Sequence, residues 1–242
     1  MKLLLIDAKY KKRIRLSRKA LDLLKKFRVV ALYASVQFSS KIQLVVEQLE
    51  KQGIKVVSSR PARTKEKYQI LGCDCFSGNL KMKETPDAFL YIGDGMFHPL
   101  ALVLQQKESS VFKPVVVFDP ISKKSSVLAR RNVEKILRKY KASLMKFISK
   151  ETVGILITTK PGQQQYSAAL SLKRKYPNKN FYYFLDNNIN YSSFDNFPFI
   201  DVWVSTACPR IAFDDSLHIK KPIINLNDAL RAEDVLSRLR IN

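Results

Sequence analysis

The sequence is poor in several features, and each shortage excludes a class of protein. It contains only three cysteines in 242 residues, a small and odd number that argues against a disulfide framework and favours a reducing compartment. No apolar run is long enough to cross a bilayer, and residues 1–7 read as a strand that meets an acid, not as a signal peptide. We therefore predict a cytoplasmic protein with no membrane partner.

Two common motifs are also missing. No Cys-x-x-Cys pair occurs, which makes a zinc ribbon a poor fit. The stretch Gly93-Asp94-Gly95 lacks the third glycine of a dinucleotide fingerprint and the acid spacing that would support one. Glycine itself is scarce, with seven in the chain, so we expect each one to lie where the backbone geometry requires it.

Acidic residues are few beside the basic ones. The chain has 43 Lys and Arg against 21 Asp and Glu, a net charge of +22. The excess is spread over both halves and is densest at Lys9, Lys11, Lys12, Arg13, Arg15, Arg18 and Lys19. Such a surface attracts nucleic acid, ribosomes or an acidic protein, and the alternative is a lysine-rich surface kept soluble by its charge.

What the sequence does contain is a repeated alternation of strands and helices. Apolar runs predict strands at residues 2–6, 28–33, 54–57, 68–71, 88–92, 115–118, 153–158, 181–185, 202–204 and 223–224. Helical spacing predicts helices over residues 14–27, 39–52, 100–106, 127–149, 165–176 and 227–239. The pattern indicates an α/β protein with two similar Rossmann-like domains, residues 1–125 and 126–242, each a small, mostly parallel sheet flanked by helices.

A cysteine follows the last strong strand, in Trp-Val-Ser-Thr-Ala-Cys-Pro-Arg at residues 203–210. Pro209 cannot donate a backbone hydrogen bond, so we expect the strand to stop there and to leave Cys208 at the sheet edge. Arg210 adds a positive charge. A thiol near positive charge at the carboxyl end of a strand is typical of reactive or metal-binding sulfur, and the alternative is a small buried hydrophobe.

The other two cysteines lie close together in the first half, in Leu71-Gly72-Cys73-Asp74-Cys75. Cys73 also follows a predicted strand. We expect the side chains of Cys73 and Cys75 to point to opposite faces of an extended segment, which would make them poor joint ligands of one metal. One of the pair can then join Cys208 at a site between the domains, and the other fills space.

Each half also carries a turn suited to a small polar ligand. Gly93–Pro99 joins a strand to a helix in the way that cradles anions. His98 either holds this turn by a hydrogen bond or acts in catalysis. Lys160-Pro161-Gly162-Gln163 occupies the equivalent place in the second half, where Lys160 either binds a carboxylate or is an ordinary exposed turn lysine.

Taken together, these segments resemble a known family. They occur in the order Leu71-Gly72-Cys73, Gly93-Asp94-Gly95-x-Phe97-His98-Pro99-Leu100, Asp119-Pro120, Thr159-Lys160-Pro161-Gly162-Gln163 and Ala207-Cys208-Pro209-Arg210-Ile211. Their order and spacing resemble the diphthamide synthase family of archaea and eukaryotes, the 2-(3-amino-3-carboxypropyl)histidine synthases. The resemblance covers nearly the whole chain.

The resemblance implies a specific chemistry. Members of the family have three similar α/β domains, and each domain gives one cysteine to a [4Fe–4S] cluster. The cluster binds S-adenosylmethionine and cleaves it to a 3-amino-3-carboxypropyl radical, which is added to a histidine of translation elongation factor two. By motif position, Cys73 and Cys208 match metal ligands, and Cys75 is the weaker candidate. Cofactor binding falls, by the same resemblance, to Asp94, Gly95, His98, Lys160, Gly162, Gln163 and Arg210.

The sequence also departs from the family pattern. Residue 1 matches a point near the end of the family's first domain, so we expect another chain to complete the cluster in a homo- or hetero-oligomer. One alternative is a non-catalytic paralogue that acts as a scaffold or redox partner of a full synthase. Another, from a different class, is a basic RNA- or ribosome-binding protein, for which the net charge is the support.

Overall fold

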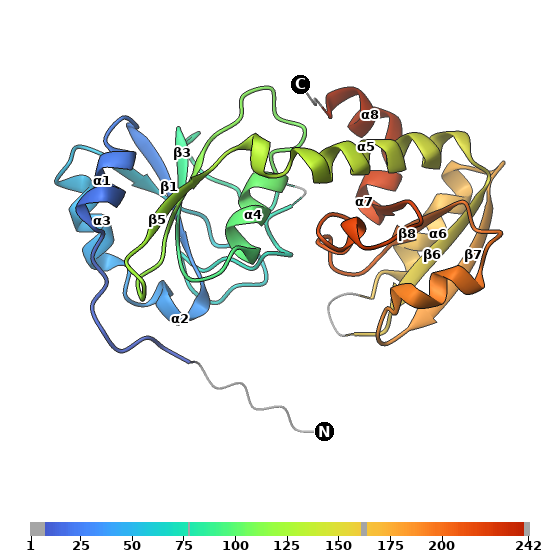
Figure 1. Cartoon of the computed structure of the whole chain (residues 1–242), viewed down its shortest axis with the longest axis horizontal. Helices are drawn as coiled ribbons and strands as arrows, with labels where there is room; N and C mark the ends of the chain where they lie inside the picture. The colour runs from blue at the N-terminus through green and yellow to red at the C-terminus, as the bar shows by residue number, and fades with distance from the viewer. Residues whose placement is uncertain (1–7, 77, 161–163, 240–242) are drawn as a thin grey trace. The chain divides into compact units, whose positions relative to one another are not determined.

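The computed structural model describes residues 8–76, 78–160 and 164–239. By its internal contacts the chain divides into two compact units (Figure 1). The first comprises residues 1–106 and 111–133, and the second comprises residues 107–110 and 134–242. The strand predicted at residues 2–6 lies outside the described residues.

The first unit is built on a five-stranded sheet with the order β2-β1-β3-β4-β5. Strands β1 (Val29–Ala34), β2 (Lys55–Val57), β3 (Ala88–Ile92) and β4 (Val115–Phe118) are parallel, and β5 (Ser125–Leu128) is antiparallel to β4. Helices of this unit are α1 (Arg18–Leu24), α2 (Val36–Ser39), α3 (Gln43–Glu50) and α4 (Phe97–Leu104), followed by the 3-10 turn η1 (Arg130–Asn132).

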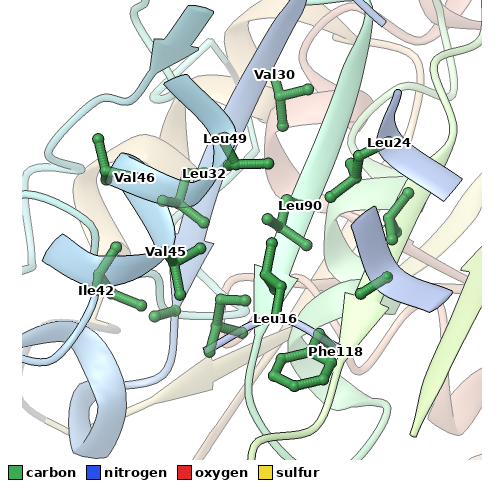
Figure 2. Close-up of a cluster of buried hydrophobic side chains, with 14 of the residues drawn as sticks. Leu16, Leu24, Val30, Leu32, Ile42, Val45, Val46, Leu49, Leu90 and Phe118 are labelled. Carbon is green, nitrogen blue, oxygen red and sulfur yellow. The ribbon is translucent and has the colours of Figure 1, made fainter. Parts of the chain in front are cut away.

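Alternate residues along β1, β3 and β4 form the main core of this unit. Leu32, Leu90 and Phe118 point to one face of the sheet and are fully buried. Figure 2 shows them packed against Leu24 of α1 and Leu49 of α3, together with other apolar side chains. Because successive residues of a strand point to opposite faces, this pattern fixes the register of the sheet and the position of the loops that follow each strand.

The second unit is a four-stranded, wholly parallel sheet with the order β7-β6-β8-β9. Its strands are β6 (Thr152–Thr158), β7 (Asn180–Asp186), β8 (Val202–Ser205) and β9 (Ile223–Asn225). The helices and 3-10 turns are α5 (Glu134–Ser149), α6 (Tyr166–Lys175), η2 (Tyr191–Asn196), η3 (Asp215–Leu217), α7 (Leu226–Ala229) and α8 (Ala232–Arg238). The predicted α/β class with two mostly parallel sheets is confirmed.

Several predicted boundaries are wrong, each for a local reason. Residues 127–149 are not one helix, because β5 pairs with β4 through a tight turn in which Lys123 has a φ of 59°. The predicted helix 14–27 begins only at Arg18, where the Ser17 side chain accepts a hydrogen bond from the Ala20 N–H. Residues 68–71 form a single bridge, Ala34 to Gln69, in place of a strand.

Two further helices are shorter than predicted. The helix predicted over residues 39–52 is split into α2 and α3, and the one predicted over residues 227–239 is split into α7 and α8. Helical periodicity persists across such short breaks, so the hydrophobic pattern alone does not reveal them.

Candidate functional site

The first candidate position lies at the carboxyl ends of β1 and β3. These strands are neighbours, yet β2 and β4 lie on their opposite sides, and this reversal of strand order is where open α/β sheets bind ligands. The loops after the two strands meet there, because the Gln37 side-chain amide donates a hydrogen bond to the Asp94 carboxylate at 3.1 Å. The predicted residues Asp94 and Gly95 are both exposed at this place.

The turn from β3 to α4 depends on its glycines. A Cβ atom at Gly93 would lie 2.4 Å from the Tyr91 hydroxyl oxygen, and Gly95 has a φ of 66°. The second value lies in the left-handed region that favours glycine. His98 lies in the first turn of α4, where its half-buried ring stacks on Tyr91 with ring centres 5.9 Å apart. This packing gives His98 a role in holding the turn.

The loop that carries Cys73 packs against this same turn. A Cβ atom at Gly72 would lie 2.5 Å from the ring of Phe97, the first residue of α4. Glycine therefore allows the cysteine loop to approach the start of the helix closely. Two sequence motifs separated by about twenty positions, Leu71-Gly72-Cys73 and Gly93–Pro99, are thus brought together within the first unit.

A buried carboxylate organises the cysteine loop. Asp74 is 2% exposed, and it accepts hydrogen bonds from the Arg63 N–H at 2.7 Å and from the Asn79 side chain at 2.9 Å. The Arg63 guanidinium in turn reaches the half-buried Cys73 sulfur, with Nη1 to Sγ at 3.6 Å. A guanidinium at this distance stabilises negative charge on sulfur. Sequence reasoning missed both Arg63 and Asp74, although an acid between two cysteines was a visible signal.

Cys75 differs sharply from Cys73. Its side chain is 1% exposed, and its thiol donates to the Gly72 carbonyl at 3.6 Å. Residues 72–76 form turns, so the premise of an extended segment is wrong. On an extended strand, residues two apart would share a face, and it is the turns that separate the two sulfurs. Burial makes Cys75 a packing residue, with Cys73 the accessible thiol of this loop.

The second candidate position is the equivalent reversal in the other unit, at the carboxyl ends of β6 and β8. The Thr158 hydroxyl caps the end of β6 by accepting a hydrogen bond from the Lys160 N–H at 3.2 Å. A pocket of about 200 Å³ opens here, lined by Thr158, Lys160, Asn187, Asn188, Ile189, Tyr191, Ala207 and Ile211. The predicted residues Gly162 and Gln163 lie outside the described residues.

Cys208 lies just beyond the same strand end. Strand β8 ends at Ser205, three residues before the cysteine, and it is a central strand between β6 and β9. The expectation that Cys208 lies at a sheet edge is therefore wrong. Cys208 instead begins a tight turn in which its carbonyl accepts a hydrogen bond from the Ile211 N–H at 3.1 Å, and its side chain is half-buried.

Tyr191 and Asp215 adjoin Cys208 and were not predicted from the sequence. The Tyr191 hydroxyl donates to the Asp215 carboxylate at 2.7 Å. Burial raises the pKa of Tyr191, and the hydrogen bond to Asp215 and the charge of that carboxylate raise it further. Tyr191 therefore stays protonated, and it lines the 200 Å³ pocket as an uncharged side chain. No pattern in the sequence links Tyr191 to Cys208 and Asp215, because Tyr191 lies between β7 and β8 whereas the other two lie between β8 and β9.

Arg210 is buried and paired within the protein, whereas a cation that binds a ligand is exposed to it. Its side chain is 3% exposed, and its guanidinium pairs with Asp214. Burial raises the pKa of Asp214, and the charge of Arg210 opposes that rise only in part. The positive charge of Arg210 is therefore directed into the fold of the Cys208 turn. Its predicted part in cofactor binding stays a prediction.

The largest pocket described lies elsewhere in the second unit. It has a volume of about 410 Å³ and is lined by aromatic side chains around Trp203, including Phe184, Phe194 and Phe197. None of the described site residues predicted from the sequence lines it. The smaller pocket is the better candidate, because it is lined by the predicted residue Lys160 and by Ala207 and Ile211 of the Cys208 motif.

Residues 8–76, 78–160 and 164–239 contain no group of three or more His, Cys, Asp or Glu side chains that could hold a metal ion. Cys73 and Cys208 each offer one accessible sulfur from a loop at a ligand-binding strand end. Each has the chemistry of a single cluster ligand, and neither unit by itself brings a full ligand set together among its described residues. None of the described helices is long and apolar enough to cross a membrane.

Fold and site together define the class of protein. Two parallel α/β units of the Rossmann type each place a cysteine loop beside the strand-order reversal. Residues 4–234 match the model of the diphthamide synthesis protein family. The chain belongs to this family.

Curated relatives bear related names. The chain is 27% identical over 200 residues to the 2-(3-amino-3-carboxypropyl)histidine synthase of Pyrococcus horikoshii, which covers 81% of this chain and 55% of the relative. It is 25% identical over 207 residues to subunit 1 of the Homo sapiens synthase, covering 83% of this chain and 44% of the relative. The chain thus spans about half the length of these relatives.

Solved structures show the same fold. The crystal structure of Dph2 from Pyrococcus horikoshii matches with a TM-score of 0.72 and 25% identity, covering 95% of this chain and 64% of that one. A structure of the same protein with a 4Fe-4S cluster matches with a TM-score of 0.71 and 24% identity, covering 93% and 62%. The agreement extends over both units of the chain.

Proposed function

We propose that this chain forms part of a 2-(3-amino-3-carboxypropyl)histidine synthase, the enzyme of the first step of diphthamide biosynthesis. The observation that carries the proposal is the exposure of two thiols, Cys73 and Cys208, each in a loop beside the strand-order reversal of its own unit. Family membership supports the choice of reaction. The substrate is then a histidine of translation elongation factor two.

Cys73 and Cys208 are the residues that would hold a [4Fe–4S] cluster. Thiolates are the usual ligands of such clusters, and the Arg63 guanidinium beside Cys73 favours the thiolate form. Since Cys75 is buried, a third thiolate would come from protein outside residues 1–242. When bound, the cluster supplies the electron for reductive cleavage of a carbon–sulfur bond of S-adenosylmethionine.

The 200 Å³ pocket would hold the amino-acid end of S-adenosylmethionine. Lys160 provides a cation for the carboxylate, and Asn187 and Asn188 provide amide groups for hydrogen bonds. The neutral, hydrogen-bonded Tyr191 closes the pocket next to Cys208. In the first unit, Asp94 and His98 would add cofactor contacts from the turn whose Phe97 packs on Gly72 of the Cys73 loop.

Anaerobic reconstitution with iron and sulfide tests the cluster assignment. We expect iron uptake by the wild-type chain when a polypeptide resembling the family's first domain is added. Cys73→Ala and Cys208→Ala should each reduce the bound iron strongly. Cys75→Ala is the matched control, because it removes a buried sulfur of the same loop, and it should bind iron like the wild type.

The same variants distinguish a cluster-binding part of the synthase from a non-catalytic scaffold or redox partner. Co-purification with a full-length synthase whose activity survives Cys208→Ala in this chain would favour a scaffold or redox partner. Two results would refute the ligand assignment. One is no iron uptake by the wild-type chain, with or without the added polypeptide, and the other is an equal loss of iron in all three cysteine variants. Binding of S-adenosylmethionine, measured by calorimetry in Lys160→Ala, tests the pocket separately from the cluster.

A further inference from the structure

One surface of the first unit has no part in the proposed reaction. Residues 9–19, hereafter the basic segment, contain seven Lys or Arg in eleven positions and no acid. The next acidic residue along the chain is Asp22. Such a density of one charge creates a strong local positive potential, unless neighbouring carboxylates neutralise it.

The backbone of the basic segment is held in place. The Tyr10 N–H donates to the Gln37 carbonyl at 2.8 Å, and the Leu16 N–H donates to the Gln48 side-chain oxygen at 2.8 Å. Ile14 is fully buried and Leu16 is 5% exposed. The segment therefore presents its charged side chains from a fixed support, which reduces the entropy lost when they bind a partner.

Most cations of this segment form no ion pair with a described carboxylate. Within the part of the chain that the structure describes, no ion pair joins its cations to a carboxylate apart from the one between Lys9 and Glu66 at 3.8 Å. The side chains concerned are all exposed: Lys11, Lys12, Arg13, Arg15, Arg18 and Lys19. Their charges are thus available to an external anion.

From Arg13 to Leu16 the segment is extended, whereas Arg18 and Lys19 belong to α1. Ile14 and Leu16 turn inward while Arg13 and Arg15 turn outward, the alternation of a strand. Outward cations two residues apart lie roughly 7 Å from each other, and adjacent residues lie about 3.3 Å apart. A nucleic-acid strand carries charges about 3.4 Å apart along a helix axis. The spacing of the outward cations is therefore about twice the spacing of the phosphates along the axis, so that each cation can meet every second phosphate.

The cationic surface continues onto a second loop. Lys65 and Lys67 flank Glu66, the residue that contacts Lys9, and both are exposed. No large apolar side chain among the described residues of the basic segment is exposed. Surface-bound membrane segments need such apolar anchors, so the composition disfavours a lipid surface.

We propose that the basic segment binds the phosphodiester backbone of a nucleic acid, with RNA as the partner. The contacts are to phosphates, so binding is independent of base sequence and strongly dependent on salt. The proposal is independent of the cluster, since no cysteine contributes to it. It gives this chain an RNA-directed surface in addition to its proposed part in histidine modification.

Salt titration of RNA binding tests the proposal. With six phosphates neutralised on a single strand, the slope of log affinity against log salt is about −4. Affinity for a mixed-sequence single-stranded RNA, measured by fluorescence anisotropy, should therefore fall roughly 300-fold between about 50 and 200 mM salt. A parallel titration with duplex RNA and with DNA shows which form of nucleic acid is preferred.

A matched pair of variants locates the surface. Changing Lys11, Lys12, Arg13 and Arg15 together to Gln should lower the magnitude of the slope by about 3. The control changes four exposed lysines elsewhere, Lys81, Lys83, Lys146 and Lys150, to Gln, and alters the net charge equally. It should keep a slope close to the wild type. Circular dichroism of both variants confirms that they are folded.

Three results would overturn the proposal. Equal loss of RNA affinity in both variants would show that net charge alone is responsible. Tighter binding of poly-glutamate than of RNA at the same salt, lost in the basic-segment variant, would assign the surface to an acidic protein. Tighter binding to phosphatidylserine vesicles with the same variant dependence would assign it to a membrane surface.

Discussion

Removal of one buried hydroxyl should destabilise the second unit strongly. Tyr140 of α5 is fully buried, and its hydroxyl donates to the Asp228 carboxylate at 2.5 Å and accepts from the Asn225 N–H at 3.1 Å. Asp228 is 5% exposed and also pairs with Lys107 at 3.2 Å. Tyr140→Phe removes both hydrogen bonds of the hydroxyl and keeps the ring, which packs on Phe213.

The size of the effect follows from these partners. A hydrogen bond to a charged group contributes about 1.5–3 kcal/mol, and a buried N–H left without a partner costs about 1–3 kcal/mol. Since Asp228 keeps Lys107, we expect the lower part of the combined range, a loss of about 2–4 kcal/mol in the free energy of unfolding. Burial raises the pKa of Tyr140, so the hydroxyl stays protonated and remains a donor up to and beyond the ordinary tyrosine pKa.

Urea unfolding followed by tryptophan fluorescence measures this loss. The chain has one tryptophan, Trp203 in β8, so its emission reports on the second unit alone. The midpoint should fall by roughly 1–2 M urea. Tyr182→Phe is the control, because Tyr182 is 45% exposed and its change should stay within about 0.5 kcal/mol. A loss below about 0.5 kcal/mol for Tyr140→Phe would refute the buried network.

Two other changes probe the same unit. Gly154→Ala would place a Cβ atom 2.5 Å from the buried ring of Trp203, so we expect a loss of about 1–3 kcal/mol and a shifted emission spectrum; an unchanged spectrum would contradict the close approach. Burial opposes ionisation of Glu108, yet Lys107 and Arg231 outweigh it and lower the pKa. Its stabilising effect is present above the ordinary glutamate pKa and is lost as the pH falls. Glu108→Gln should therefore weaken the acid sensitivity of the midpoint, and an unaltered pH profile would contradict the ion-pair assignment.

Strong apolar runs made most of the fold readable in the sequence. Residues 88–92 and 115–118 are continuous apolar stretches, and the structure contains strands with those bounds. A buried parallel strand needs apolar side chains on both faces, so its limits appear directly in the sequence. Strand β5 was hidden because it is an edge strand with two exposed residues, and its pairing depends on the hairpin turn before it.

The candidate site was only partly readable. Glycines at 72, 93 and 95 marked the places where the backbone is constrained, and the structure explains each by a close neighbour or a positive φ. Arg63 beside Cys73, and Tyr191 with Asp215 beside Cys208, were not visible. Arg63 lies in the same connection between strands as Cys73, and Asp215 in the same connection as Cys208, whereas Tyr191 comes from a different one. Loop residues carry no periodic signal that would have linked them.

The sequence by itself therefore determined the α/β class, the family resemblance and the three cysteines, because composition, periodicity and motif order are local properties. Only the tertiary structure decided which thiols are accessible. Burial separates Cys75 from Cys73, although only Asp74 lies between them in the sequence. In the folded chain, Arg210 is buried and paired with Asp214, and the charged side chains of the basic segment are exposed to solvent. Exposure and charge neutralisation depend on neighbours that fold in from elsewhere, and a linear pattern does not contain them.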